Sequence, residues 1–225
     1  MNIVTFTSIT GGKDNLIEKQ NTVGADFFAF VGEPKESKTW KQIQVYDKFN
    51  SDRRNSRVVK LIPHKYFDCE YSIWLDGNLS LLVPAKELIE KYLNGYDIAV
   101  FKHPIRNCIY KEAIECAKRG LDDPEVIIEQ VKAYEDEGFP KEYGLGENMM
   151  ILRRHTKKIE QFNNAWFVEY ARYSTRDQLS FMYVADKVGL PVNFIDEQFI
   201  EKDGRWIRGG IIEIVPHLTE QVIGN

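Results

Sequence analysis

The chain reads Ile73-Trp74-Leu75-Asp76-Gly77-Asn78, an apolar segment followed by an acid, a glycine and an amide. Burial of Ile73 and Leu75 would hold the segment as a strand, and Gly77 would let the backbone turn and approach a ligand closely. Asp76 would then lie where strands end and substrates bind in α/β proteins. Because Asp-Gly is also a common turn dipeptide, a purely structural role competes with a functional one. We predict Asp76 as the first candidate for a ligand contact.

The rest of the chain alternates between strand and helix patterns. Strands are predicted at residues 3–7, 26–31, 43–46, up to residue 76, 96–101 and 149–152. Helices are predicted at residues 52–62, 85–93, 110–118, 124–137, 157–172 and 175–188. The first two strands fit the start of a βαβ unit, and residues 192–225 mix short strand patterns with loops that could fold back over a site. The alternation predicts one α/β domain over residues 1–225, a sandwich with a mostly parallel central sheet.

Composition narrows the class of protein. A length of 225 residues with 43% hydrophobic residues is enough to bury a substantial core. The net charge of −4 argues against a general nucleic-acid or membrane-surface binder. Three cysteines, Cys69, Cys108 and Cys116, are odd in number and are predicted to be reduced thiols. The start lacks a signal-peptide pattern, and no apolar run approaches about 18 residues, so we expect a cytoplasmic protein without a transmembrane segment.

The helix predicted at residues 52–62 carries a cationic stripe. Arg53, Arg57 and Lys60 fall at positions i, i+4 and i+7, so one face would present three positive charges. Such a stripe suits a diphosphate, although a solvated charged face would have the same pattern. The short distance in sequence to Asp76 favours the functional interpretation, because a metal and cations together neutralise a leaving diphosphate.

Polar residues also follow other predicted strands. His64 follows the cationic helix, and His103 and Arg106 follow the strand at residues 96–101, where they could hold substrate hydroxyls or phosphate. Histidines of this kind are also common as hydrogen-bonded structural residues. Glu147 and Asn148 belong to a glycine-bearing loop before the strand at 149–152, and they offer the paired donors and acceptors that sugar hydroxyls need.

Three further segments are ambiguous. The spacing of Ser174 and Asp177 is close to a capping box, yet Arg176, Asp177 and Gln178 at a helix start could equally face a reaction centre. The Gly11-Gly12 loop after Thr7 could cradle a nucleotide. His217 could reach back as a metal ligand, because imidazole binds borderline metals such as manganese.

Together these segments resemble the glycosyltransferase-like family of plant mucilage-synthesis and turgor-regulation proteins with bacterial and viral relatives. The resemblance spans about residues 55 to 185. The residues that carry it are Arg57 to Lys60, Pro63-His64, Ile73 to Asn78, His103 with Arg106, Glu147, Arg153-Arg154-His155, Trp166-Phe167 with Glu169, and Arg176 to Phe181.

This resemblance implies a nucleotide-sugar-dependent glycosyltransferase of the GT-A type, a single α/β/α domain with Mn²⁺ or Mg²⁺ near the acid. The usual motif is Asp-x-Asp; here Asp76-Gly77-Asn78 replaces the second acid by a weaker amide ligand, so His217 would join Asp76 and Asn78 on the metal. The resemblance places Glu147, Asp177 and Gln178 at the reaction centre. The implied partners are a nucleotide-sugar donor and an unspecified carbohydrate, lipid or protein acceptor. The expected binding residues are Thr7, Gly11, Gly12, Arg53, Arg57, Lys60, His64, Asp76, Gly77, Asn78, His103, Arg106, Asn148 and Arg176.

Two other hypotheses remain open at this level. A metal-dependent hydrolase of a lipid or amide could use His64, His103, His217 and Asp76 around a metal-bound water, although these histidines lack tight metal-ligand spacing. A binding module could keep the fold without catalysis, which the amide at Asn78 makes conceivable. Nucleotide affinity separates the hydrolase from the other two, and turnover separates the transferase from the module.

Overall fold

A mixed sheet with one reversed strand forms the centre of the protein. The computed structural model describes residues 1–12 and 14–217. The order in the seven-stranded sheet is β3-β2-β1-β4-β7-β6-β8, and β7 is antiparallel to both neighbours while the other pairs are parallel. The strands are β1 (Ile3–Ile9), β2 (Asp26–Val31), β3 (Lys41–Gln44), β4 (Tyr71–Leu75), β6 (Ile98–Lys102), β7 (Gly146–Arg154) and β8 (Val192–Ile195). The predicted α/β class with a mostly parallel sheet is confirmed.

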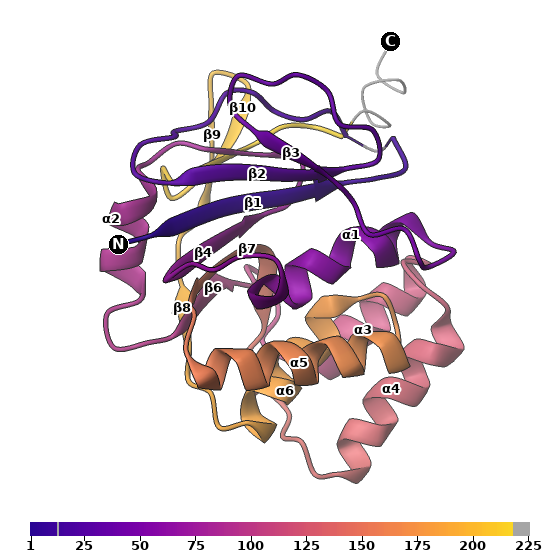
Figure 1. Ribbon diagram of the computed structural model, residues 1–225. Helices are drawn as coiled ribbons and strands as arrows, with labels where there is room; N and C mark the ends of the chain where they lie inside the picture. The colour runs from indigo at the N-terminus through magenta and orange to yellow at the C-terminus, as the bar shows by residue number, and fades with distance from the viewer. Residues whose placement is uncertain (13, 218–225) are drawn as a thin grey trace.

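Helices pack against one face of this sheet and a small sheet against the other. In Figure 1, the helices below the sheet are α1 (Asp52–Leu61), α3 (Ile109–Lys118), α4 (Pro124–Asp136), α5 (Lys157–Arg172) and α6 (Asp177–Lys187). The opposite face carries α2 (Ala85–Tyr92) and a four-stranded antiparallel sheet of order β5-β11-β10-β9. Its strands are β5 (Leu79–Leu81), β9 (Phe199–Lys202), β10 (Arg205–Arg208) and β11 (Ile212–Ile214). The predicted return of the chain end is therefore observed as far as residue 217.

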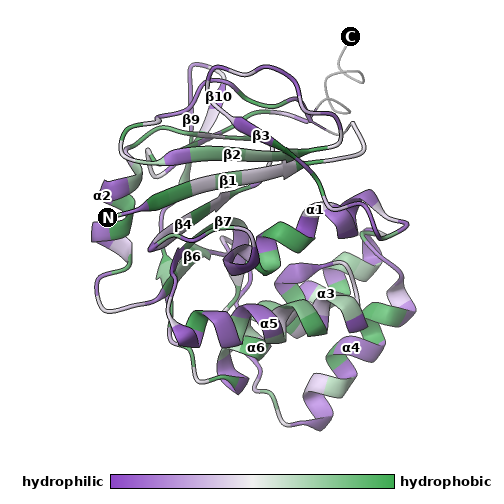
Figure 2. Ribbon diagram, viewed as in Figure 1, coloured by the Kyte–Doolittle hydropathy of each residue, from purple (hydrophilic) through white to green (hydrophobic). Residues whose placement is uncertain are grey.

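Side chains alternate between the two faces of the central sheet, so the core consists of one apolar cluster on each face. In β4, Trp74 packs on the helical side, whereas Ile73 and Leu75 join the apolar cluster under the small sheet. Figure 2 shows the largely hydrophobic course of β1 and β2. Trp166 and Tyr170 of α5 are buried, and Phe167 is partly buried against the same cluster.

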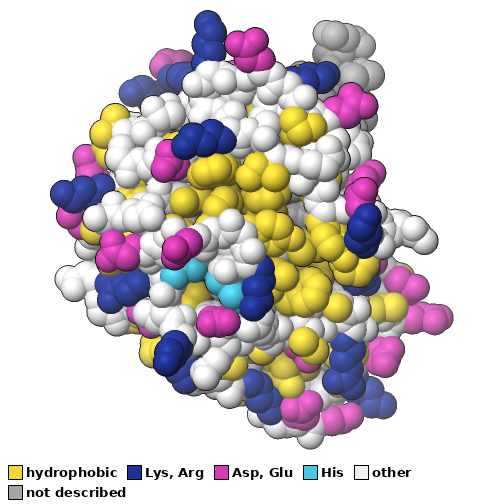
Figure 3. All heavy atoms as spheres, viewed as in Figure 1, with side chains coloured by type: hydrophobic (Ala, Val, Ile, Leu, Met, Phe, Trp, Pro, Cys, Tyr) yellow, Lys and Arg dark blue, Asp and Glu magenta, His cyan; other side chains and the backbone are white. Residues whose placement is uncertain are grey.

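A group of aromatic side chains lies between strands β1 and β2 and the segment that follows α1. Phe67 contacts Phe6, Phe28 and Phe30, with ring centroids between 5.1 and 5.9 Å apart. Figure 3 shows hydrophobic side chains gathered over this part of the surface. The cluster fixes the segment after α1, and with it the direction from which α1 reaches the end of the sheet.

Some predicted boundaries were wrong for identifiable reasons. The predicted βαβ start lacks its helix in the described part of residues 10–25, because this segment runs along the small sheet. Asn21 N–H donates to Leu81 O (2.8 Å) and Ser80 Oγ donates to Lys19 O (2.5 Å). Strand β7 begins at Gly146, so Glu147 and Asn148 lie on a strand and not in a flexible loop. Helix α6 begins at Asp177, and Ser174 Oγ donates to Gln130 Oε1 (2.6 Å) in place of capping that helix.

The three cysteines are free thiols, as predicted. Burial raises the pKa of Cys69 to about 12 and also raises the pKa of Cys116, which makes both poor nucleophiles. Among residues 1–12 and 14–217, no helix combines the length and the apolar character that a membrane span requires.

A buried polar cluster between β4, β7 and α5 makes folding sensitive to acid. His155 Nε2 lies 2.8 Å from Ser72 Oγ, and Asn163 Nδ2 lies 3.3 Å from His64 Nδ1. Arg153 is fully buried and donates from Nη2 to Lys60 O (2.9 Å). Burial, together with the charges of Arg153 and His64, lowers the pKa of His155 from 6.5 to about 4. His155 therefore stays neutral in the folded protein where the unfolded chain would be protonated.

This shift predicts a loss of stability as pH falls from 6.5 to 4. The unfolded state then binds one more proton, so the contribution of His155 is fully present above pH 6.5 and declines by up to about 3 kcal/mol near pH 4. Urea unfolding of the wild type and His155→Gln at pH 4, 5, 6 and 7 measures this effect. The variant should show a shallower pH slope, and identical slopes would contradict the assignment to His155.

Candidate active site

Two adjoining cavities open at the edge of the sheet where the parallel strands end. The larger has a volume of about 390 Å³ and the smaller about 240 Å³, and both are lined by Arg57, Asp76 and Arg176. A third cavity of about 740 Å³ adjoins the larger one along Ile9 to Gly11. We call the two cavities that share Asp76 the cleft, and the names larger cavity and smaller cavity refer to these two. Asp76 thus borders both cavities directly after β4, at the position predicted for a ligand contact.

The Asp76 turn is held from several directions. Asp76 N–H donates to Met149 O (2.8 Å), and Trp74 Nε1 donates to Asp76 Oδ1 (2.8 Å). A Cβ at Gly77 would lie 2.9 Å from Ile9 Cγ1, so a side chain there would force the turn away from β1. Asn78 is tied to the end of the chain, since Asn78 Nδ2 donates to Val215 O (3.2 Å) and Val215 N–H donates to Asn78 O (2.9 Å).

The cationic stripe of α1 reaches the cleft, but its members differ in exposure. The side chain of Lys60 is only 2% exposed, and its Nζ lies 2.5 Å from Asp177 Oδ2 and 3.6 Å from Asp76 Oδ1. Arg57 lies within 3.9 Å of the same two carboxylates. Lys60 therefore lines the smaller cavity while it is paired with Asp177, and its contact with a leaving group stays a prediction. Its position at i+7 places it about two helical turns from Arg53, at the buried end of α1.

These ion pairs keep Asp177 charged. Burial alone would raise the pKa of Asp177, but the positive charges of Lys60 and Arg57 outweigh burial and hold the pKa below its usual value. Asp177 sits at the first residue of α6, and its backbone carbonyl accepts a hydrogen bond from Trp166 Nε1 (3.0 Å). The carboxylate is thereby fixed at the floor of the smaller cavity as an anion.

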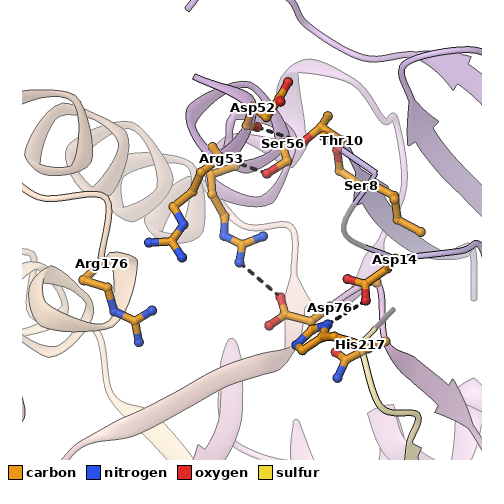
Figure 4. A pocket seen from close by; sticks show the side chains of 14 residues that line it. Ser8, Thr10, Asp14, Asp52, Arg53, Ser56, Asp76, Arg176 and His217 are labelled. Carbon is orange, nitrogen blue, oxygen red and sulfur yellow. Dashed lines mark hydrogen bonds and ion pairs between the residues drawn. The ribbon is translucent and has the colours of Figure 1, made fainter. Parts of the chain in front are cut away.

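Three guanidinium groups converge on the larger cavity. Arg53, Arg57 and Arg176 all line it, and Figure 4 shows Arg53 of α1 and Arg176, the residue before α6, pointing into the same space. Burial and the like charges of Arg176 and Arg57 lower the pKa of Arg53. Arg176 Nε is buried without a hydrogen-bond acceptor in residues 1–12 and 14–217. The cavity also carries the carboxylates of Asp14, Asp52 and Asp76, so the three guanidinium groups form one positively charged side of it, where an anion can be held.

Glu147 has a partner that the sequence did not reveal. Arg208 of β10 is buried, donates to Glu147 Oε2, and stacks between Phe101 and Phe199 with its Cζ 4.2 and 4.6 Å from the ring centroids. Burial raises the pKa of Glu147, and Arg208 counteracts this only in part. Nothing in the short strand pattern around Arg208 distinguishes it from a surface arginine, because its contact spans 61 residues.

Amide side chains complete the smaller cavity. Asn148 is 4% exposed, and neither its Oδ1 nor its Nδ2 has a hydrogen-bond partner in the described residues. Gln178 Nε2 donates to Gly146 O (2.8 Å) and so packs α6 onto the start of β7. An unpaired amide at a cavity wall can both donate to and accept from a sugar diol.

His103 and Arg106 line the smaller cavity but are engaged in its wall. His103 Nδ1 accepts from the Arg106 backbone N–H (3.0 Å), and Arg106 Nε donates to Glu112 Oε2 (2.6 Å). Burial lowers the pKa of His103. Their expected role in holding a substrate is thus shared with a structural one, the bracing of the loop after β6.

His217 lies on the opposite wall of the larger cavity from the arginines. Its Nδ1 is 2.6 Å from Asp14 Oδ1, and Figure 4 shows both side chains facing Asp76. Gly11 and Gly12 have φ angles of 66° and 64°, and a Cβ on Gly11 would lie 2.7 Å from Asp52 Oδ2. The glycine loop therefore packs tightly on the start of α1 and separates the larger cavity from the third one.

Two predicted binding residues lie elsewhere. Thr7 is buried inside β1, and its neighbour Ser8 lines the larger cavity. His64 does not line the cleft, because Pro63 begins a short turn that directs the imidazole to Asn163 on α5. The set proposed for a hydrolase is therefore not assembled around one point. Within the described ranges, no three His, Cys, Asp or Glu side chains are placed to hold one metal.

Comparison with known sequences gives two curated relatives from Arabidopsis thaliana. The probable hexosyltransferase MUCI70 is 32% identical over 178 residues, which is 74% of this chain and 31% of that protein. The alkaline ceramidase TOD1 is 25% identical over 180 residues, which is 72% of this chain and 39% of that protein. The chain thus spans about a third of the length of these relatives.

Solved structures with a similar course of the chain include three glycosyltransferases. They are the apo bifunctional glycosyltransferase WbbM (TM-score 0.44, 15% identity, 86% of this chain and 38% of that one) and the galactosyltransferase LgtC with donor and acceptor sugar analogues (0.43, 13%, 81% and 70%). The third is apo mouse xyloside xylosyltransferase 1 (0.47, 11%, 87% and 84%).

The sequence profile described as TOD1/MUCI70, glycosyltransferase-like domain matches residues 14–205, which include most of the cleft. The chain therefore belongs to the TOD1/MUCI70 glycosyltransferase-like domain family.

Proposed function

We propose that this domain transfers a sugar from a nucleoside-diphosphate donor to a hydroxyl group of an acceptor. The observation that carries the proposal is the convergence of Arg53, Arg57 and Arg176 on a cavity bordered by Asp76. A diphosphate that leaves during transfer needs fixed positive charge around its oxygens, and arginine pairs with phosphate through two parallel hydrogen bonds. In this arrangement the diphosphate lies in the larger cavity, the nucleoside extends into the third, and the transferred sugar enters the smaller one.

The two acids of the smaller cavity suit different roles. Glu147 has a raised pKa, so it is the better group to accept the proton of the acceptor hydroxyl. Asp177 has a lowered pKa and stays anionic, so it suits the stabilisation of positive charge that develops on the sugar as the diphosphate departs. Asn148 would hold sugar hydroxyls through its unpaired amide.

The chemistry of the residues around Asp76 fits a divalent metal that the substrate helps to hold. Asp76, Asn78 and His217 line the larger cavity, and they offer one carboxylate, one amide and one imidazole. Mg²⁺ sites commonly use one or two carboxylates and complete their coordination with substrate phosphates and water, so a preformed cluster of three acids is not needed. When bound, Mn²⁺ or Mg²⁺ would supply further positive charge to the diphosphate.

Thermal unfolding with nucleotides tests the proposal. A panel of nucleoside diphosphates and their sugars, each with and without Mn²⁺ or Mg²⁺, should raise the melting temperature for one nucleotide, and more with the metal than without it. The metal alone should have little effect, since phosphate oxygens complete its site. Transfer or hydrolysis of the sugar of the stabilising donor is then measured directly.

The outcomes separate the competing functions. Stabilisation together with transfer supports the transferase, and stabilisation without any turnover supports a binding module. Failure of every nucleotide to stabilise the protein would rule out the proposal and leave the hydrolase hypothesis, which requires no nucleotide.

A further inference from the structure

Trp206 is exposed in a way that the other tryptophans are not. Its side chain is 52% exposed, whereas Trp40, Trp74 and Trp166 are buried. Within residues 1–12 and 14–217, its indole N–H has no hydrogen-bond acceptor and its ring has no aromatic or cationic partner. A large flat apolar side chain with a free donor is suited to a ligand that is apolar on one face and polar at its rim.

The strand register places Trp206 at the end of a row that starts at the cleft. Trp206 lies opposite Ile214 on β11 and Glu201 on β9, and Ile214 lies opposite Leu79 on β5. Leu79 directly follows Asn78, which lines the larger cavity. Exposure increases along this row from buried Leu79 to partly buried Ile214, half-exposed Trp206 and exposed Glu201.

The same face of β10 reaches the smaller cavity. Successive side chains on a strand alternate between faces, so Trp206 and Arg208 share one face and are separated by roughly 7 Å along the strand. Arg208 donates to Glu147, which lines the smaller cavity. Trp206 is therefore two positions along β10 from Arg208. Arg208 holds Glu147, the acid to which we assign the acceptor proton. In Figure 1, β9 and β10 lie on the side of the central sheet opposite the large helices.

We propose that Trp206 is a binding platform for a sugar ring of a carbohydrate acceptor. A pyranose has C–H groups on its face and hydroxyl groups on its rim, so its face can stack on the indole while its hydroxyls bond the Glu201 carboxylate and the indole N–H. A single exposed ring beside a carboxylate suits a sugar better than a lipid chain, which needs a continuous apolar surface. The inference rests on the proposed function, since it assigns the acceptor to the side of the cleft where Glu147 lies.

Fluorescence tests the platform without any enzymatic assay. Because Trp206 is the exposed tryptophan, quenching by acrylamide reports mainly on it. Cellobiose, lactose, maltose and xylobiose serve as probes, and at least one should protect the wild type from quenching. Trp206→Ala should lose the protectable component, and Trp206→Tyr should retain weak binding measured by calorimetry. If none of the four disaccharides protects the wild type from quenching, the proposal is overturned.

The second readout is the steady-state kinetics of transfer, measured with the donor that stabilises the protein against thermal unfolding. Trp206→Ala should raise the KM for a carbohydrate acceptor about tenfold, with the donor KM and kcat unchanged, since stacking of this kind is worth about one factor of ten in affinity. Tyr96→Ala is the matched control, because Tyr96 is an exposed aromatic residue before the start of β6, whereas the cavity residue His103 follows the end of that strand. An unchanged acceptor KM overturns the platform. Sugar protection without transfer in any variant supports the platform while the transferase proposal fails.

Discussion

Replacement of Asp76 by alanine should lower sugar transfer by about a thousandfold while the protein remains folded. The carboxylate borders both cavities, pairs with Arg57 and Lys60, and is the one carboxylate among the expected metal ligands Asp76, Asn78 and His217. Loss of one group that organises charge around a departing anion typically costs about 10²- to 10³-fold in rate, and loss of a metal ligand adds to this. Transfer under saturating donor and acceptor, with circular dichroism for the fold, measures the effect.

Two matched variants control this experiment. Asp76→Asn keeps an oxygen that can accept the Trp74 indole hydrogen bond, so it separates loss of charge from loss of that contact. Asp196→Ala removes an exposed carboxylate that follows β8 and pairs with Lys102 outside the cleft, and it should transfer normally. Undiminished turnover in Asp76→Ala would remove the central assignment of the cleft.

The second large effect concerns stability, and it should come from Lys60. Lys60→Met should lower the free energy of unfolding by about 3 kcal/mol, because it leaves the Asp177 carboxylate buried with only Arg57 at 3.7 Å as a cation. Methionine keeps the length of the side chain, so the loss reports on charge and not on a cavity. Urea unfolding at neutral pH gives the value.

A double variant shows whether the pair is the cause. Lys60→Met with Asp177→Asn removes both charges, and it should be more stable than the sum of the two single losses predicts, by more than about 1 kcal/mol. Lys41→Met is the matched control, since Lys41 Nζ also lies 2.8 Å from a carboxylate, that of Asp26, but both side chains are more than half exposed. Its loss should stay below about 1 kcal/mol. Equal losses in Lys60→Met and Lys41→Met would show that burial of the pair does not matter.

Local patterns were enough to predict the strand before Asp76 and the cationic stripe of α1. Both depend on residues a few positions apart, where the periodicity of a strand or helix decides which side chains share a face. The stripe could not show that Lys60 is buried against Asp177 while Arg53 is partly exposed in the larger cavity. That difference depends on how α1 packs against the end of the sheet, and the sequence of the helix carries no information about it.

Contacts between distant segments were beyond the reach of pattern analysis. Strand β5 has three residues and acquires its partner from β11, more than 130 positions later in the chain. Arg208 reaches Glu147 across 61 positions, and Arg208 resembles any charged residue in a short surface strand. The first three residues of β7 were predicted as a loop because they include a glycine and an asparagine, which are depleted from strands in general.

The contacts between residues 208–217 and the cleft have a consequence for biosynthesis. Arg208, Val215 and His217 contact Glu147, Asn78 and Asp14 respectively, so ten consecutive residues hold three walls of the site. During translation the central strands and α1 leave the ribosome well before this segment. A nascent chain can therefore form most of its core before the contacts that support the cleft are in place. The three walls are therefore joined only after residues 208–217 have been synthesised, later than every strand of the central sheet and α1.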